Sequence, residues 1–111
     1  MRIALDFDNT YTLDPLFWDD FIDSLKSSGY TVSFVTLRGD PSLLGSPCNS
    51  DIKGAAEKLG IEIIFTNGQQ KAGLFKADIW IDCLPVNIPV STDLINMHKG
   101  CLINKDSNPA L

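Results

Sequence analysis

Three aspartates of this chain follow short apolar runs, where carboxylates are well placed to take part in chemistry. Asp6 and Asp8 come directly after the run RIAL, and Asp82 ends the segment DIWID. Like charges gathered at one site repel one another unless a cation neutralises them. Magnesium prefers oxygen ligands, takes one or two carboxylates and keeps several waters. We therefore expect Asp6, Asp8 and Asp82 to bind Mg2+ if the fold brings them together.

A hydroxyl and an ammonium group complete this candidate site. Thr36 ends the segment TVSFVT, and Lys71 lies in the connection that precedes the last aspartate. A hydroxyl donates a hydrogen bond to a phosphate oxygen, and a lysine attracts phosphate as a point charge. These groups together predict phosphoryl transfer, with one aspartate as the nucleophile and a second carboxylate moving the proton. The alternative for Lys71 is a solvated surface residue, with Lys76 in its place.

Segments typical of strands and of helices alternate along the chain. Compact apolar or β-branched runs predict strands at residues 2–7, 31–36, 61–65 and 78–82. Apolar residues at helical spacing predict one helix from Asp14-Pro15 to Gly29 and another over residues 52–59. We expect a loop at 38–50, a short helical turn at 71–76, a short helix at 93–98 and an edge strand at 100–103.

This alternation predicts an α/β fold with a three-layer, doubly wound parallel sheet of the Rossmann-like kind. Ligands of such sheets bind beyond the carboxyl ends of the strands, so the polar residues at those ends should converge on one edge. If strand geometry continued through Asp8, its side chain and that of Asp6 would share a face of the sheet.

The first helix has two expected faces. Its apolar residues at four-residue spacing should face the core, with Ile22 beside them: Phe17, Phe21 and Leu25. Its acidic residues should form a solvated face: Asp19, Asp20 and Asp23.

With these residues in this order, the chain resembles the haloacid dehalogenase-like (HAD) phosphatases. The segment Asp6-Phe7-Asp8-Asn9-Thr10 is similar to the DxDxT motif that opens that superfamily. Thr36, Lys71 and Asp82 are similar in kind and order to its later motifs, so the resemblance covers residues 1 to about 85.

The resemblance implies a HAD-like fold and a role for each matching residue. Asp6 would be the nucleophile and a metal ligand. Asp8 would be the general acid/base and would bind the metal through its backbone carbonyl. Thr36 and Lys71 would hold the transferring phosphoryl group, and Asp82 would complete the Mg2+ site.

Substrate contacts are assigned to two further residues. Asn9 lies inside the first motif, and Arg38 forms a Thr-x-Arg sequence that looks like the second motif of nucleotide and nucleic-acid-end phosphatases in the superfamily. Thr10 is expected to support the loop. The chain departs from the family in one place: the family often has two acidic residues at its last motif, and here Cys83 follows Asp82.

The organisation of the chain predicts a small enzyme without a cap domain. Residues 1–103 are expected to form the HAD-like catalytic domain and residues 104–111 a flexible tail. The segments between the motifs are too short for a cap, so the site would be open unless the 38–50 loop or a second copy in a homo-oligomer covers it. Neither a membrane span nor a signal peptide is apparent, which favours the cytoplasm.

The net charge and the cysteine content limit which binding partners, disulfides and metal sites we expect. A formal net charge of −5 disfavours an extended grip on nucleic acid, which relies on basic residues. Three cysteines, none in a CxxC pair, disfavour a disulfide framework or zinc site. The Cys83 thiol is expected to be inert.

The predicted function is therefore a Mg2+-dependent phosphate monoester hydrolase acting through a phospho-Asp6 intermediate. The substrate would be a phosphorylated small molecule, a nucleotide or a nucleic-acid end. Two alternatives stay open: a non-catalytic HAD-like binding protein, and a phospho-accepting regulatory module that resembles receiver domains. The latter is disfavoured because receivers carry their phospho-acceptor after the third strand, where this chain has Phe65-Thr66-Asn67.

Overall fold

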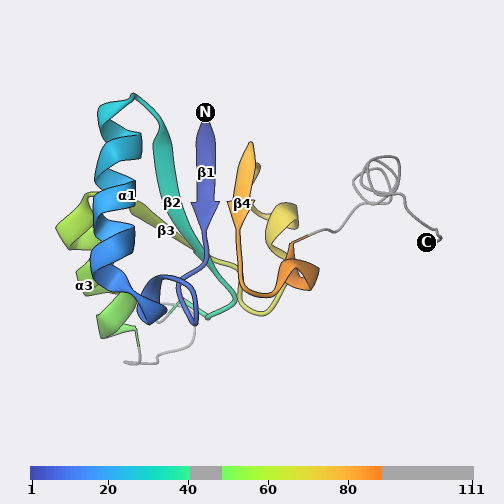
Figure 1. Cartoon of the computed structure of the whole chain (residues 1–111). Helices are drawn as coiled ribbons and strands as arrows, with labels where there is room; N and C mark the ends of the chain where they lie inside the picture. The colour runs from blue at the N-terminus through green and yellow to red at the C-terminus, as the bar shows by residue number, and fades with distance from the viewer. Residues whose placement is uncertain (41–48, 89–111) are drawn as a thin grey trace.

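Four short runs of the sequence form one all-parallel sheet (Figure 1). The computed structural model describes residues 1–40 and 49–88. The strands are β1 (Arg2–Leu5), β2 (Thr31–Thr36), β3 (Glu62–Phe65) and β4 (Ile79–Ile81), in the spatial order β3-β2-β1-β4. The α/β class and the parallel sheet are thus confirmed.

The strand order creates a point at which the chain reverses its direction across the sheet. From β1 the chain steps outward to β2 and β3, then returns past β1 to form β4 on the other side. In the register Ala4 pairs with Ser33 on one side and with Trp80 on the other. Because parallel crossovers are right-handed, this order places the first two connections on one face and the third on the opposite face.

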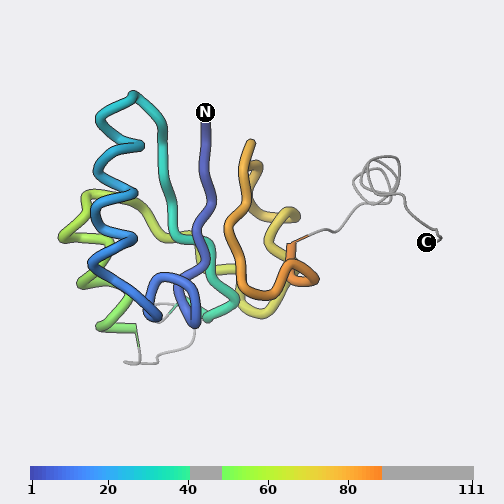
Figure 2. The backbone as a smooth tube through the Cα atoms, in the orientation of Figure 1, coloured from blue at the N-terminus to red at the C-terminus, as the bar shows by residue number. Residues whose placement is uncertain are grey.

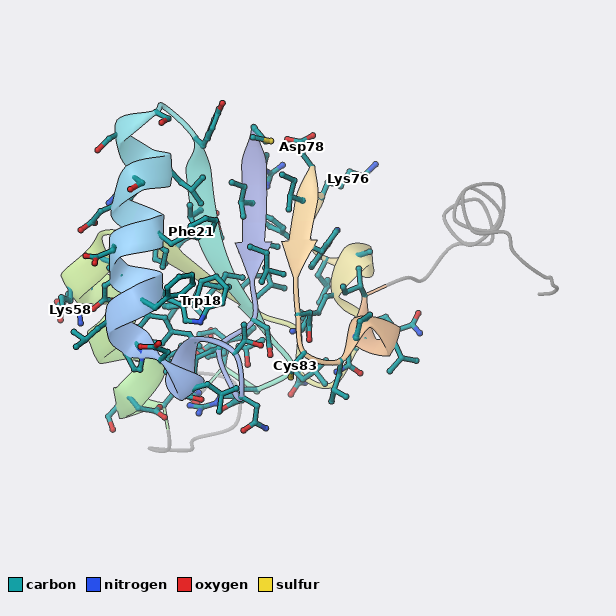
Figure 3. All side chains as sticks on the ribbon, viewed as in Figure 1. Trp18, Phe21, Lys58, Lys76, Asp78 and Cys83 are labelled. Carbon is teal, nitrogen blue, oxygen red and sulfur yellow. The ribbon has the colours of Figure 1, made fainter. Side chains whose placement is uncertain are left out.

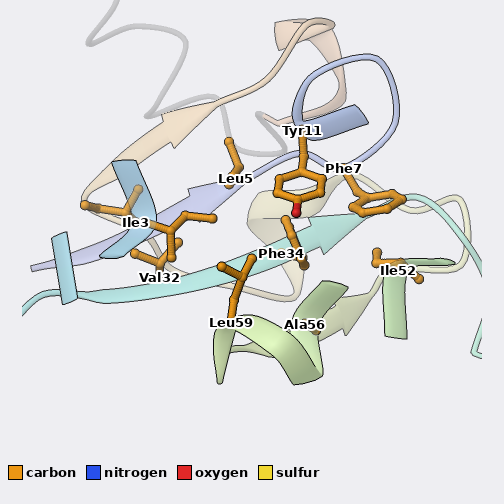
Figure 4. Close-up of a cluster of buried hydrophobic side chains, with 10 residues drawn as sticks. Ile3, Leu5, Phe7, Tyr11, Val32, Phe34, Ile52, Ala56 and Leu59 are labelled. Carbon is orange, nitrogen blue, oxygen red and sulfur yellow. The ribbon is translucent and has the colours of Figure 1, made fainter. Parts of the chain in front are cut away.

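The core confirms this division of the connections between the two faces. On one face, buried side chains from β1 and β2 pack with residues of α1 (Pro15–Ser27) and α3 (Ser50–Leu59). Figure 4 labels members of this cluster from β1, β2 and α3. On the other face, Phe75 of the β3–β4 connection packs against Ala4 and Val35. Among the described residues both helices therefore lie on the same face of the sheet.

Helix α1 begins as predicted, but two of its predicted core residues are exposed. The Asp14 side chain caps the helix by accepting a hydrogen bond from the Phe17 amide at 3.3 Å. The assignment of Phe17 and Phe21 to the core was wrong, since they are 55% and 37% exposed. The residues of α1 that pack against the core are Ile22, Leu25 and Trp18, so the predictions for Ile22 and Leu25 are confirmed. Periodicity alone did not distinguish the packed residues from the exposed ones, because both groups include aromatic residues.

One acidic residue of α1 is also not on a solvated face. The Asp19 carboxylate accepts a hydrogen bond from the Tyr11 hydroxyl at 2.6 Å and forms an ion pair with Lys58 of α3 at 2.9 Å. These two donors lower the pKa of Asp19, against the opposing effect of partial burial. Asp20 and Asp23 are exposed, as expected.

Helix α3 ends at Gly60, where the backbone requires glycine. Gly60 has a φ of 68°, and a Cβ atom there would lie 3.0 Å from the Lys26 ammonium. That ammonium donates hydrogen bonds to the carbonyl groups of Leu59 and Gly60, which satisfies carbonyls at the end of the helix and ties α1 to α3.

Several predicted elements lie outside the described residues: most of the 38–50 loop, the helix at 93–98, the strand at 100–103 and the tail from residue 104. The predicted turn at 71–76 is a 3₁₀ turn over Lys71–Gly73. In the part of the chain that the structure describes, no helix is long and apolar enough to cross a membrane.

Candidate functional site

The carboxyl ends of the strands all point to one edge of the sheet, where the turns after β1, β2 and β4 gather (Figure 2). The amide of Asp6 donates to the Ile81 carbonyl at 2.9 Å, so the β1–β4 pairing extends one residue beyond β1. The site therefore lies where the order of strands reverses, which is where parallel sheets of this kind bind ligands.

The chain leaves strand geometry after Leu5, and this separates the two aspartates of the first motif. Phe7 turns into the core and stacks on Tyr11, with ring centroids 5.4 Å apart. Asn9 has a positive φ of 60°, and its amide donates to the Thr12 hydroxyl at 2.9 Å. The condition under which Asp6 and Asp8 would share a face of the sheet is therefore not met, because β1 ends at Leu5.

A buried lysine joins Asp6 to Asp82. The Lys71 Nζ lies 2.7 Å from Asp6 Oδ1 and 2.5 Å from Asp82 Oδ2. The Lys71 side chain is 1% exposed, and those of Asp6 and Asp82 are 9% and 2% exposed. We call these three residues the closed triad. Buried charges persist only when they are paired in this way.

The connection between β3 and β4 delivers Lys71 to this edge. The 3₁₀ turn at Lys71–Gly73 is tied to the segment after β4 by the Ala72 amide, which donates to the Ile88 carbonyl at 2.9 Å. Asp82 is fixed by its other oxygen, which accepts from the Leu84 amide at 2.9 Å. Lys76, the alternative considered from sequence, is exposed and lies at the opposite edge of the sheet from Cys83 (Figure 3).

A second, more open group surrounds Asp8. The Arg38 guanidinium donates to both Asp8 oxygens, at 2.6 and 2.9 Å, and to both Asp51 oxygens, at 2.6 and 3.0 Å. The Arg38 side chain is 23% exposed, and those of Asp8 and Asp51 are 48% and 55% exposed. We call these residues the open triad. Asp51 lies in the first turn of α3, a position that favours acidic residues.

The charges of the open triad shift each other's titration. Hydrogen bonds from Arg38 lower the pKa of Asp51 to about 2, against the opposing effect of partial burial. Hydrogen bonds to Asp51 and then to Asp8 raise the pKa of Arg38 above its already high value. Asp51 and Arg38 are therefore both charged across the neutral range.

Thr36 lies between the two triads at the end of β2. It is 1% exposed, and its hydroxyl oxygen accepts a hydrogen bond from the Arg38 amide at 3.2 Å. The turn that follows β3 also supports this segment, because the Thr66 amide donates to the Thr36 carbonyl at 2.9 Å. Tertiary pairing between turns thus holds the end of β2 in place.

A cleft of about 110 Å³ opens at this edge. Its walls include five residues predicted from sequence to be functional: Asp6, Asp8, Asn9, Thr36 and Asp82. Cys83 and Asn87 also line it. Of the remaining predicted residues, Lys71 contacts the cleft through its two carboxylate partners, and Arg38 contacts it through Asp8.

Cys83 is part of the site in a way that sequence reasoning did not anticipate. Its Sγ lies 3.5 Å from Asp6 Oδ2 and 3.7 Å from the backbone carbonyl oxygen of Asp8. Ligand atoms of Asp6, Asp82 and Cys83 all lie within 4.8 Å of one another. The signal available in the sequence was its position next to Asp82.

Sequence reasoning missed the role of Asp51, and it had no signal for it. Thr10 was expected to support the loop, and its hydroxyl donates to Asp6 Oδ2 at 3.0 Å, so it also orients the carboxylate.

Comparison of the chain with protein-family models, with curated proteins and with solved structures found no match.

Proposed function

We propose that the protein hydrolyses phosphate monoesters through a phospho-Asp6 intermediate, as its resemblance to HAD-like phosphatases implies. The observation that carries this proposal is the position of Asp6. Its carboxylate lines the cleft, while Lys71 and Thr10 hold its two oxygens in fixed directions. A nucleophile needs both access to the substrate and a fixed orientation, and Asp6 has them.

The strand order supports the same proposal. The order β3-β2-β1-β4 corresponds to the beginning of the Rossmann-type order, in which β1 lies between β2 and β4. Flavodoxin-like sheets, which receiver domains share, have β1 between β2 and β3. The observed order therefore argues against a receiver-like regulatory module. We propose that the complete fold is the three-layer, doubly wound HAD-like sheet without a cap.

The first half of the proposed reaction transfers the phosphoryl group to the protein. An Asp6 oxygen attacks phosphorus, the bond from phosphorus to the ester oxygen breaks, and Asp8 in its protonated form gives a proton to the departing alcohol. Lys71 and the Thr36 hydroxyl offset the charge that builds up on the phosphoryl oxygens.

The second half releases phosphate. Asp8, now ionised, takes a proton from a water molecule that attacks phosphorus. The bond between phosphorus and the Asp6 oxygen breaks, so free phosphate leaves and the Asp6 carboxylate is restored. Asp8 returns to its protonated form, ready for another cycle.

The donor set at the cleft fits a divalent cation. The Asp6 carboxylate, the Asp8 backbone carbonyl and the Asp82 carboxylate would hold Mg2+, which prefers such oxygen ligands. When bound, the ion would offset negative charge on the transferring phosphoryl group. Lys71 already offsets one of the two buried carboxylate charges, so the closed triad keeps one net negative charge to attract a cation.

Arg38 is the proposed substrate contact, together with Asn9. Its guanidinium bridges two exposed carboxylates and can exchange one of them for a phosphate, which it binds in the same bidentate geometry. This exchange would also free Asp8 for proton transfer. The cleft volume suits a small phosphate ester or a nucleotide's phosphate end better than an extended polymer.

The test is inorganic phosphate release from nucleotides, sugar phosphates and an end-phosphorylated oligonucleotide, with Mg2+ or with chelator. We expect the wild type to release phosphate when Mg2+ is present and not when chelator is present. We expect Asp6→Asn to release none in either condition. Asp20→Asn is the matched control, because Asp20 is exposed on α1, away from the site. Equal release by Asp6→Asn and wild type would refute the mechanism. If neither releases phosphate, the non-catalytic alternative gains support. Cytoplasmic location and homo-oligomerisation stay predictions.

A further inference from the structure

A sulfur atom lies beside the oxygen atoms that would hold the metal ion of the proposed function. Cys83 is a free cysteine whose Sγ faces Asp6 Oδ2 and the Asp8 carbonyl oxygen. The same carbonyl and carboxylate are the groups expected to hold Mg2+. The thiol is thus not an isolated surface cysteine, because it converges with oxygen donors from β1 and β4 on one point of the cleft.

The distances match the spacing of ligands around a single small ion. Two ligands bound tetrahedrally to zinc, with a metal–sulfur distance of about 2.3 Å and a metal–oxygen distance of about 2.1 Å, are about 3.6 Å apart. The Sγ of Cys83 lies 3.5 Å from Asp6 Oδ2 and 3.7 Å from the Asp8 carbonyl oxygen. Each of these two distances is therefore the one expected between a sulfur and an oxygen that bind the same zinc ion.

The charges also balance for a divalent ion bound by a thiolate. The Asp6 and Asp82 carboxylates and a Cys83 thiolate carry three negative charges, Lys71 offsets one, and a divalent cation offsets the other two. On binding, the thiol proton passes to solvent and a metal–sulfur bond forms. Thiolates favour zinc-like ions over magnesium, whose preferred ligands are oxygens.

We propose that Cys83 makes this site selective for a thiophilic divalent cation of the zinc class, in preference to Mg2+. This inference rests on the metal site of the proposed function, but it does not depend on catalysis. Cys83 alone changes the expected metal ion of this chain, because a carboxylate at the same position would favour Mg2+.

The experiment uses Co2+ as a spectroscopic substitute for zinc and Cd2+ as a calorimetric probe, on the full chain. Cys48→Ser and Cys101→Ser are introduced first, so that Cys83 is the only cysteine. We expect a near-ultraviolet thiolate-to-cobalt charge-transfer band in this background. The band should disappear in Cys83→Ser and in Cys83→Asp, and Asp6→Asn should weaken Co2+ binding at least about tenfold.

Competition by calorimetry measures the selectivity. The Cys83-only protein should bind Cd2+ at least about a hundredfold more tightly than Mg2+, and Cys83→Asp should shift that ratio toward Mg2+ by at least about tenfold. A Co2+ complex without the charge-transfer band would overturn the proposal, as would an unchanged ratio in Cys83→Asp. Circular dichroism confirms that each variant is folded. Metal binding without phosphate release would leave this inference intact and refute only the proposed function.

Discussion

Two cation–carboxylate triads lie at the same edge of the sheet, and they differ mainly in their access to water. In the closed triad, Lys71 is 1% exposed between two almost fully buried carboxylates. In the open triad, Arg38 is 23% exposed between carboxylates that are about half exposed. Ion pairs gain little net stability near water, while breaking a buried pair leaves an uncompensated charge.

The difference suggests a division of labour at the site. The closed triad holds Asp6, the proposed nucleophile, in a fixed position and cannot rearrange without a large cost. The open triad holds Asp8 and Arg38 together close to the cleft, but solvent can replace either of the contacts that Arg38 makes. Under the proposed function, the residue that binds and releases phosphate lies in the open triad, and the residue that must keep its position lies in the closed triad.

Removing the closed triad's cation should have the largest effect. We expect Lys71→Met to lower the free energy of unfolding by about 3–5 kcal/mol, because two buried carboxylates lose their partner. Urea denaturation in the presence of a chelator measures this free energy of unfolding. Lys76→Met, at an exposed lysine, should change stability little. Equal losses in the two variants would remove the distinction between the triads.

Removing the open triad's cation should change activity more than stability. With the proposed phosphatase activity as the readout, Arg38→Gln should lower kcat/KM by about 10- to 100-fold. This factor corresponds to the loss of about 1.5–3 kcal/mol, the contribution of a hydrogen bond to a charged group. Most of that loss should appear in KM, because Arg38 is proposed to contact the phosphate of the substrate and not the reacting bond. A loss confined to kcat would instead indicate that Arg38 acts only by positioning Asp8.

Asp51 tests the open triad without touching the cleft. We expect Asp51→Asn to lower the free energy of unfolding by at most about 1 kcal/mol, because its side chain is 55% exposed. Its folded pKa is lowered to about 2, so its contribution is present above the unfolded value near 4 and is lost as pH falls toward 2.

The pH dependence of this stability difference tests whether the Asp51 carboxylate stabilises the fold. The stability difference between Asp51→Asn and wild type should be constant from about pH 5 to 8 and should shrink below about pH 4. Urea titrations across that range measure it. A difference that instead grows as pH falls would show that Asp51 does not stabilise the fold as a carboxylate.

Raising the salt concentration should have the smallest effect on stability, and that effect should distinguish the two triads. Raising ionic strength to about 1 M shortens the screening length to about 3 Å, which weakens exposed pairs much more than buried ones. The stability loss caused by Asp51→Asn should therefore shrink in 1 M NaCl, whereas that caused by Lys71→Met should stay the same. Parallel shrinkage in both variants would contradict the closed character of the Lys71 triad.

The local pattern of the sequence determined the elements of the fold. β-Branched and aromatic runs marked all four strands to within two residues at each end, and Asp14-Pro15 marked the start of α1. These features are predictable because strand propensity and helix capping depend on neighbours along the chain. The rule that parallel strands present their carboxyl ends at one edge also predicted that Asp6 and Asp82 would approach each other.

Only the tertiary structure decided which partner each charged group has. Asp8 faces Arg38 and Asp51 because the chain leaves strand geometry after Leu5, and no local pattern marks that exit. The face that α1 buries depended on the sheet beneath it, against which Trp18 packs and Phe17 does not. Cys83 meets the Asp8 carbonyl across 75 residues of sequence. Such contacts depend on how β1 and β4 pair in space, whereas propensity and periodicity report only on residues a few positions apart.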